Sequence, residues 1–137
     1  MAKKAKKKPR KGVKRTRNLG TLTESEYFSK IRSSLRRAFR YWLPAMEALK
    51  LASRPYVGPN KLQKKEYQCA ECKKWFKQTE VEVDHIIPVG SLKSYDDIVP
   101  FLKRLTPEDV SCFAVMCKPC HQIKTNKEKN ARKNSID

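Results

Sequence analysis

The stretch that decides the fold opens with Cys69-Ala70-Glu71-Cys72, continues through Asp84-His85-Ile86-Ile87-Pro88 and closes with Cys117-Lys118-Pro119-Cys120-His121. Two C-x-x-C pairs therefore stand on either side of an Asp-His dipeptide. Four thiolates with this spacing are typical of a tetrahedral structural Zn²⁺ site, although a redox dithiol or two unrelated buried pairs would share the pattern. We predict one structural zinc ion, and its ligands are Cys69, Cys72, Cys117 and Cys120.

Both histidines of the chain, His85 and His121, belong to this stretch. Successive helical residues point about 100° apart, so Cys120 can face the zinc while His121 faces a separate site. A carboxylate such as Asp84 suits a hard divalent cation, and a neutral imidazole suits water activation near neutral pH. Asp84 and His85 alone would equally fit a turn cap and a half-buried histidine, and His121 a spare zinc ligand.

The charge of the chain indicates a polyanionic partner. At 137 residues there is room for one compact domain and an appendage, and the formal net charge is +18. Nucleic acid is the first candidate and an anionic membrane surface the second; we predict DNA and no membrane. The basic start is not followed by an apolar run of signal or spanning length, so we expect an intracellular protein.

Three segments are expected along the chain. Residues 1–18 are rich in Lys and Arg and contain no acid, which predicts a disordered basic arm, with a solubilising tail or an import signal as alternatives. Residues 19–60 are predicted to form a helical region. Residues 61–137 contain the cysteine and histidine motifs and are predicted to form the functional domain.

An amphipathic, basic helix is predicted from Thr23 onward. Thr23 and Glu26 match a capping box, and Pro44 should end or kink the helix. Its apolar residues recur at spacings of three and four, at Phe28, Ile31, Leu35, Phe39 and Trp42. The apolar stripe would pack on the zinc module, form a dimer seam or lie on DNA, and the arginines of the other faces would contact phosphates or be solvated.

Strands and helices alternate in residues 61–137. The residue types predict strands from Leu62 to Tyr67, through Val81 and Val83 to Asp84, and from Phe113 to Met116. Helical spacing is found between Ile98 and Leu105, and a final polar, basic helix should run from about Pro119 to Lys133.

Together the motifs resemble the HNH endonuclease family, most closely its small, zinc-containing, phage-type members. The family pattern C-x-x-C, Asp-His-Ile-x-Pro, C-x-x-C-His-x-x-Lys is matched over about residues 65–130, ending at Lys124. The resemblance implies an α+β fold containing a ββα-metal finger, in which a hairpin and a helix clasp one divalent cation. It further implies that Asp84 and His121 hold catalytic Mg²⁺, Mn²⁺ or Ni²⁺ and that His85 is the general base.

We therefore expect a metal-dependent DNA endonuclease that hydrolyses phosphodiester bonds by nicking or by double-strand cleavage. The residues predicted to contact DNA, mainly at phosphates, are Lys118, Lys124, Lys127, Arg132, Arg36 and Arg40. One alternative is a zinc-stapled nucleic-acid-binding module without catalysis. Another is a phage packaging or recombination accessory that acts beside a partner in the bacterial cytoplasm.

One position departs from the family pattern. Relatives usually carry Asn or His about five residues before the second C-x-x-C, where this chain has Cys112. That residue helps to fix the loop that orients the catalytic imidazole. Cys112 is tolerated if only its carbonyl matters, whereas His85 is held less well if an amide side chain is needed.

Overall fold

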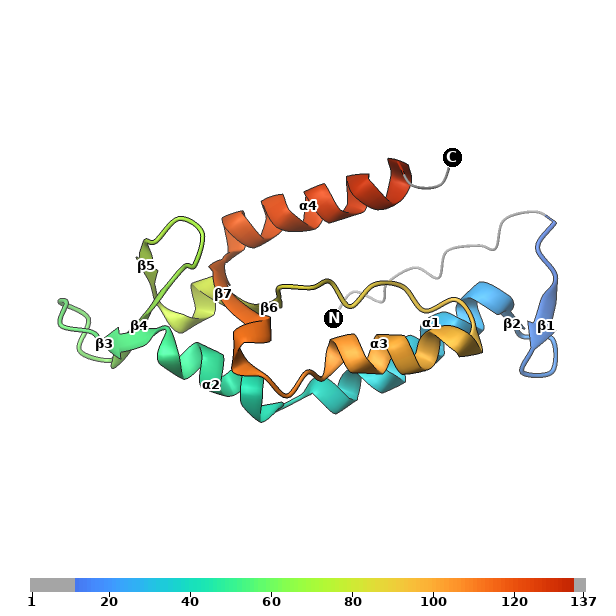
Figure 1. Cartoon of the computed structure of the whole chain (residues 1–137), viewed down its shortest axis with the longest axis horizontal. Coiled ribbons are helices and arrows are strands. Elements are labelled where there is room, and N and C mark those ends of the chain that lie inside the picture. Colours follow the sequence, from blue (N-terminus) through green and yellow to red (C-terminus); the bar gives the residue numbers. More distant parts are fainter. Residues whose placement is uncertain (1–11, 135–137) are drawn as a thin grey trace.

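The chain is a small α+β protein, as predicted, and its computed structural model describes residues 12–134 (Figure 1). Within them, four α-helices accompany three small antiparallel sheets, with the strand orders β1-β2, β3-β4-β5 and β6-β7. In chain order the elements are β1 (Arg15–Arg17), β2 (Leu22–Thr23), α1 (Glu24–Arg36), a 3-10 turn (Arg37–Phe39), α2 (Leu43–Leu51), β3 (Ser53–Pro55), β4 (Lys65–Gln68), β5 (Trp75–Phe76), a 3-10 turn (Gln78–Glu80), β6 (Val81–His85), a 3-10 turn (Tyr95–Asp97), α3 (Ile98–Leu105), a 3-10 turn (Val110–Cys112), β7 (Phe113–Cys117) and α4 (Lys118–Asn134).

The capping box at the start of α1 is confirmed. The Thr23 hydroxyl accepts from the Glu26 N–H at 3.1 Å, and the Glu26 carboxylate accepts from the Thr23 N–H at 3.0 Å. The helix ends earlier than predicted, because the chain tightens into a 3-10 turn and Tyr41 adopts a φ of +59°. Pro44 does not end this helix but lies in the first turn of α2, where proline lacks only an N–H that has no helical partner.

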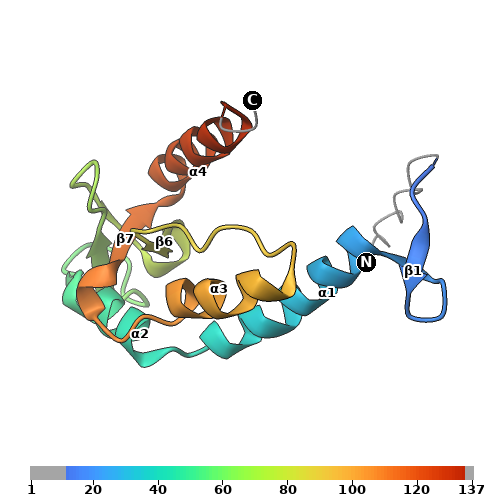
Figure 2. The same ribbon diagram turned by 45° about the vertical axis from the view of Figure 1, so that its right-hand side comes forward.

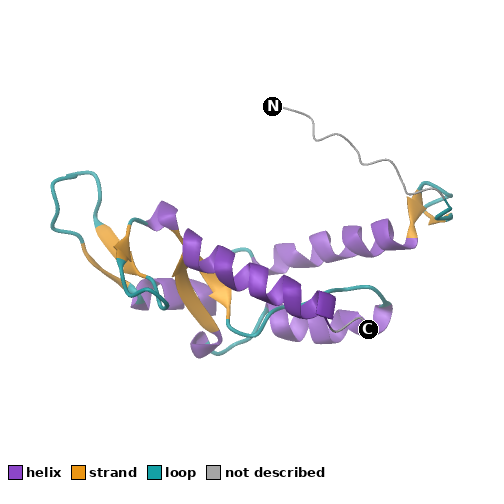
Figure 3. Ribbon diagram, turned by 90° about the horizontal axis from the view of Figure 1, so that it is seen from above, coloured by secondary structure: helices purple, strands orange, loops and turns teal. Residues whose placement is uncertain are grey.

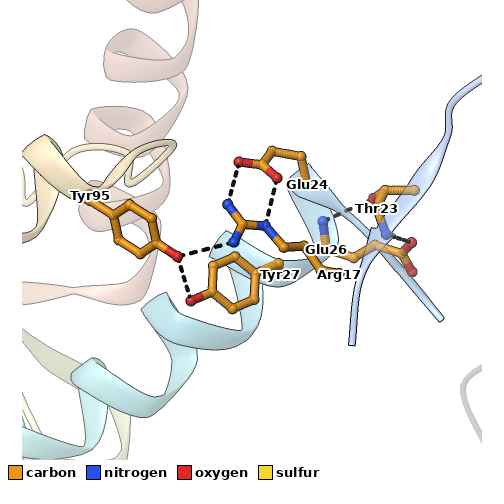
Figure 4. A network of polar contacts seen from close by, with 6 residues as sticks. All are labelled: Arg17, Thr23, Glu24, Glu26, Tyr27 and Tyr95. Carbon is orange, nitrogen blue, oxygen red and sulfur yellow. Dashed lines mark hydrogen bonds and ion pairs between the residues drawn. The ribbon is translucent and has the colours of Figure 1, made fainter. Parts of the chain in front are cut away.

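The prediction of a disordered arm over residues 1–18 is wrong for the last residues of that segment. Residues 1–11 lie outside the described residues, but Arg15–Arg17 form β1, which pairs with β2. Arg17 binds both carboxylate oxygens of Glu24 at 2.9 and 3.0 Å, donates to the Tyr95 hydroxyl at 3.1 Å and lies 4.5 Å from the centre of the Tyr27 ring (Figure 4). The guanidinium of Arg17, which was predicted to belong to the disordered arm, is therefore held in the fold by a carboxylate and by aromatic rings.

The predicted boundary at residue 60 divides a sheet. Strand β3, which was not expected from the sequence, pairs with β4 so that Ser53 lies opposite Tyr67 and Pro55 opposite Lys65. The region predicted to be helical therefore contributes α1 and α2 but also β2 and β3. A strand was missed here because Pro55 suggests a break, whereas proline is tolerated at the end of an edge strand.

Strands β6 and β7 form a two-stranded ribbon that leads directly into α4. The register places Val81 opposite Cys117 and His85 opposite Phe113. Helix α2 contacts both strands, and α4 contacts both as well (Figure 2). The predicted strands at Val81–Asp84 and Phe113–Met116 and the helices at 98–105 and 119–133 are confirmed in position.

The main apolar core lies between α1 and α3, which run side by side (Figure 3). Phe101 and Leu105 of α3 are almost completely buried and pack with Phe28 of α1. A second cluster joins Ala45 and Ala48 of α2 to Phe113 of β7. No helix among residues 12–134 has the length and apolarity needed to cross a bilayer.

Candidate metal sites

The four predicted zinc ligands come together in the structure. Their sulfur atoms all lie within 4.8 Å of one another, and Cys72 Sγ is 3.8 Å from Cys117 Sγ. Two sulfurs of a tetrahedral site with Zn–S bonds of about 2.3 Å lie about 3.8 Å apart, so this separation fits zinc. Cys69 follows β4, Cys117 ends β7 and Cys120 lies in the first turn of α4. The four-cysteine cluster can therefore hold a structural zinc ion that joins two sheets and a helix.

The local backbone holds these ligands in place. The Ala70 N–H donates to the Val115 carbonyl at 2.7 Å, which fastens the first C-x-x-C turn to β7. Lys73 adopts a φ of +62°, and this left-handed residue returns the chain into β5. Phe76 packs against the cluster of Cys69, Met116 and Cys117 and gives it an apolar cover.

The pKa values of Cys69 and Cys120 are shifted in opposite directions. Burial opposes ionisation of Cys69, but main-chain hydrogen bonds with Cys117, Cys72 and Glu71 outweigh it and lower the pKa of Cys69 to about 6. A sulfur–sulfur hydrogen bond with Cys117 is the largest of the effects that raise the pKa of Cys120 to about 12. Since a metal ion binds thiolates, zinc binding at this site releases protons.

The structure also brings Asp84 and His121 together, from β6 and α4. Asp84 Oδ1 lies 3.3 Å from His121 Nε2, and the Asp84 side chain is only 15% exposed. Glu82, two residues earlier on the same face of β6, lies with its Oε2 2.8 Å from His121 Nδ1. The His121 imidazole thus has a carboxylate oxygen beside each of its two nitrogens. Glu82 was not predicted, although its spacing of two from Asp84 is the signal that finds it.

Lys124 completes this group, one turn after His121 on α4. Its ammonium contacts Asp84 Oδ2, the His85 carbonyl at 2.8 Å and the Ile86 carbonyl at 3.5 Å. It also lies 3.4 Å from Glu128 Oε1. In residues 12–134, only the four cysteines bring three or more metal-binding side chains this close together, and at the contact of Asp84 with His121 one carboxylate meets one imidazole.

His85 lies on the other side of the ribbon from Asp84. Its ring centre is 4.6 Å from that of Phe39 and 5.0 Å from that of Phe113, and its Nε2 is 2.8 Å from the Leu105 carbonyl. The strand therefore alternates regularly up to its last residue, and the Asp84 and His85 side chains point to opposite sides of the ribbon.

Cys112 lies outside the four-cysteine cluster, and its main chain fixes the loop after His85. The Cys112 carbonyl accepts a hydrogen bond from the Ile86 N–H at 2.9 Å. This contact uses no side-chain atom, so cysteine supplies it as well as Asn or His does.

The residues predicted to bind DNA lie on α1 and α4, apart from Arg40, which follows the 3-10 turn after α1. Lys118, Lys127 and Arg132 of α4 are exposed, as are Arg36 and Arg40. Burial, followed by the charges of Arg36 and Arg132, lowers the pKa of Arg32, which shows that the end of α4 lies near α1. Cationic side chains of α1 and α4, two helices far apart in the sequence, therefore come near one another at Arg32 and Arg132.

Comparisons with protein-family models, with curated proteins and with solved structures find no significant match. Function is therefore inferred from the side chains and their geometry.

Proposed function

We propose that the chain is a metal-dependent endonuclease that hydrolyses phosphodiester bonds in DNA, braced by a structural zinc ion. The observation that carries the proposal is the 3.3 Å separation of Asp84 Oδ1 and His121 Nε2. The zinc ligand Cys120 precedes His121 directly, so the cysteine cluster positions the first turn of α4 against β6.

The donor set of this pair suits a divalent cation. Two ligand atoms about 2.1 Å from an octahedral ion and adjacent around it lie about 3 Å apart, close to the observed separation. Mg²⁺ commonly binds to one or two carboxylates and keeps its other positions for water and phosphate, and Mn²⁺ and Ni²⁺ accept an imidazole as well. Asp84 and His121 would hold the ion, and Glu82 would orient the imidazole from its other nitrogen.

The order of elements supports the resemblance to HNH endonucleases. Strand β6 pairs with β7, although α3 lies between them in the sequence, and β7 runs directly into α4; Asp84 is on β6 and His121 on the helix. This is the arrangement expected of a ββα-metal finger. At the position where the family usually has Asn or His, the Cys112 carbonyl makes a main-chain contact to the loop after His85, and this contact does not depend on the side chain.

His85 is the proposed general base. Donation from Nε2 to the Leu105 carbonyl fixes the tautomer and leaves the lone pair on Nδ1, while Phe39 and Phe113 hold the ring. The base takes a proton from water, the water oxygen bonds to phosphorus, and the bond from phosphorus to the 3′ oxygen breaks. A cation on Asp84 and His121 would stabilise negative charge on the phosphate and the departing oxygen.

The mechanism requires the scissile phosphate at the end of β6. Asp84 and His85 are consecutive there and point to opposite sides of the ribbon, so the phosphate must lie between them at the strand end. The net charge of +18 and the exposed lysines and arginines of α4 supply sequence-independent attraction for the rest of the duplex.

Plasmid nicking tests the proposal. The zinc-loaded protein should convert supercoiled DNA to the open circle only with Mg²⁺, Mn²⁺ or Ni²⁺, and His85→Ala should slow this step by about 10²–10⁴-fold. DNA binding in a gel-shift assay should stay unchanged in the variant, because His85 is not a phosphate ligand. Equal nicking by His85→Ala would place the reaction elsewhere or in a contaminant.

A non-catalytic zinc-braced DNA-binding module is the second candidate. The observation that favours it is the contact of Lys124 with Asp84, which neutralises the carboxylate that the cation needs. Salt-sensitive binding to DNA without metal-dependent nicking would select this candidate.

A further inference from the structure

The ammonium of Lys124 lies among oxygen atoms in the way that a bound cation would. Asp84 Oδ2 and the carbonyls of His85 and Ile86 face it from the end of β6, and Glu128 faces it from α4. The Lys124 side chain is 27% exposed and that of Asp84 15%. Carboxylate and main-chain oxygens are the ligands that hard metal ions prefer, so lysine and metal ion seek the same partners.

The Asp84 carboxylate cannot neutralise the Lys124 ammonium and bind a divalent cation at the same time. The carboxylate has one oxygen on His121 and the other on Lys124, and its charge compensates a single ammonium. A divalent ion beside Oδ1 would lie within a few ångströms of the ammonium, where like charges repel and little water screens them. The lysine must therefore move away, or the ion binds weakly.

The helix offers the displaced side chain a second anion. Glu128 lies one turn after Lys124, with 3.4 Å between Oε1 and Nζ. The four-carbon stem of lysine is flexible, and an (i, i+4) pair on a helix surface is favourable. A small rotation therefore carries the ammonium out of the oxygen group while it keeps a carboxylate partner.

We propose that Lys124 and the divalent cation exchange at Asp84, so that the lysine is a built-in competitor for the metal ion and leaves the carboxylate when the ion binds. This inference rests on the cation site of the proposed function. The exchange links two ligands: a DNA phosphate that attracts the Lys124 ammonium opens the site for the metal ion, and by linkage the bound ion frees the lysine for the phosphate.

Direct titration of Mn²⁺ into the full-length, zinc-loaded protein tests the exchange without any use of catalysis. Lys124→Met should bind Mn²⁺ at least about tenfold more tightly than the parent, because the competing ammonium is gone. Lys129→Met is the matched control, since Lys129 is exposed on the same helix and its loss changes the net charge equally. The control should stay within about threefold of the parent.

Lys124→Gln provides a second variant with a polar end and no charge, and circular dichroism establishes that each variant is folded. Equal or weaker Mn²⁺ binding by folded Lys124→Met or Lys124→Gln overturns the exchange, and so does an equal gain in Lys129→Met. The nicking assay and the Mn²⁺ titration test the two proposals independently. If the protein does not nick DNA but Lys124→Met shows the tenfold gain in Mn²⁺ affinity, the exchange is supported and the nuclease proposal is contradicted.

Discussion

Removal of the zinc ion should destabilise the whole fold. The cysteine cluster links residues that are far apart, because Cys72 and Cys117 are separated by 45 positions. It also joins strands of two different sheets, whose main-chain connection at this point includes the hydrogen bond from Ala70 to Val115. Without the ion, four thiols, two of them almost fully buried, remain in the place of an apolar core.

The magnitude follows from the length of the closed loop. A cross-link over about 45 residues removes about 13 cal/mol/K of chain entropy from the unfolded state, which is about 4 kcal/mol at 25 °C. A total stability of about 5–15 kcal/mol is usual for a domain, so this alone is a large fraction. For a chain of this length it corresponds to a loss of at least about 10 °C in Tm.

The assay combines metal analysis with thermal unfolding. Zinc is removed with a high-affinity chelator under reducing conditions, its loss is confirmed by elemental analysis, and Tm is followed by circular dichroism. Cys117→Ser should reproduce the loss, whereas Cys112→Ser should not, because Cys112 lies outside the cluster. A zinc-free protein that melts within about 3 °C of the loaded protein would refute the role of the cross-link.

Three further outcomes are expected. Glu82→Gln should weaken Mn²⁺ binding by about 10–100-fold, because the carboxylate that orients His121 is lost. Glu80→Gln, at an exposed residue, is the control and should leave Mn²⁺ binding unchanged. Equal affinities of the two variants in a direct titration would contradict the orienting role of Glu82. Phe101→Ala should lower the free energy of unfolding in urea by about 3–5 kcal/mol, because it leaves a cavity in the core. Val99→Ala, at an exposed residue, should lower it by less than about 0.5 kcal/mol. A small effect of Phe101→Ala would mean that neighbouring side chains fill the cavity. The Lys93 and Ser94 main-chain N–H groups lower the pKa of Asp97. The stabilisation by the Asp97 carboxylate is therefore present above the unfolded pKa of about 3.9 and is lost as the pH falls through the folded value. The difference in Tm between the parent and Asp97→Asn should close in acid, and a difference that stays constant with pH would contradict this role.

Much of the fold was predictable because local signals and burial agree. The capping box at Thr23, the helical spacing from Ile98 to Leu105 and the strand before Cys117 all lie where the sequence places them. The errors lie where long-range contacts override local preference. Pairing with β4 makes a strand of Ser53–Pro55, and the bond from Arg17 to Glu24 orders a segment whose composition indicates disorder.

The candidate site was predictable in its ligands but not in its charge balance. Motif spacing identifies Asp84 and His121, and the structure places them in contact. Glu82 and Glu128 carry no motif, and only the packing of α4 on β6 shows that they bracket His121 and Lys124. The predicted role of Lys124 as a phosphate ligand also omits Asp84, since sequence distance gives no measure of an ion pair that spans 40 positions.

One peptide bond connects the four-cysteine cluster with the proposed cation site. Cys120 is a zinc ligand candidate and His121 the next residue, so any movement of the first turn of α4 displaces both. A separation of 3.3 Å between two ligand atoms tolerates little displacement, because each ion–ligand distance must stay close to about 2.1 Å. Loss of zinc should therefore weaken Mn²⁺ binding at Asp84 even at temperatures where the protein stays folded. The reverse effect should be small, because Asp84 and His121 contribute no sulfur to the cluster and closure of the 45-residue loop does not depend on them.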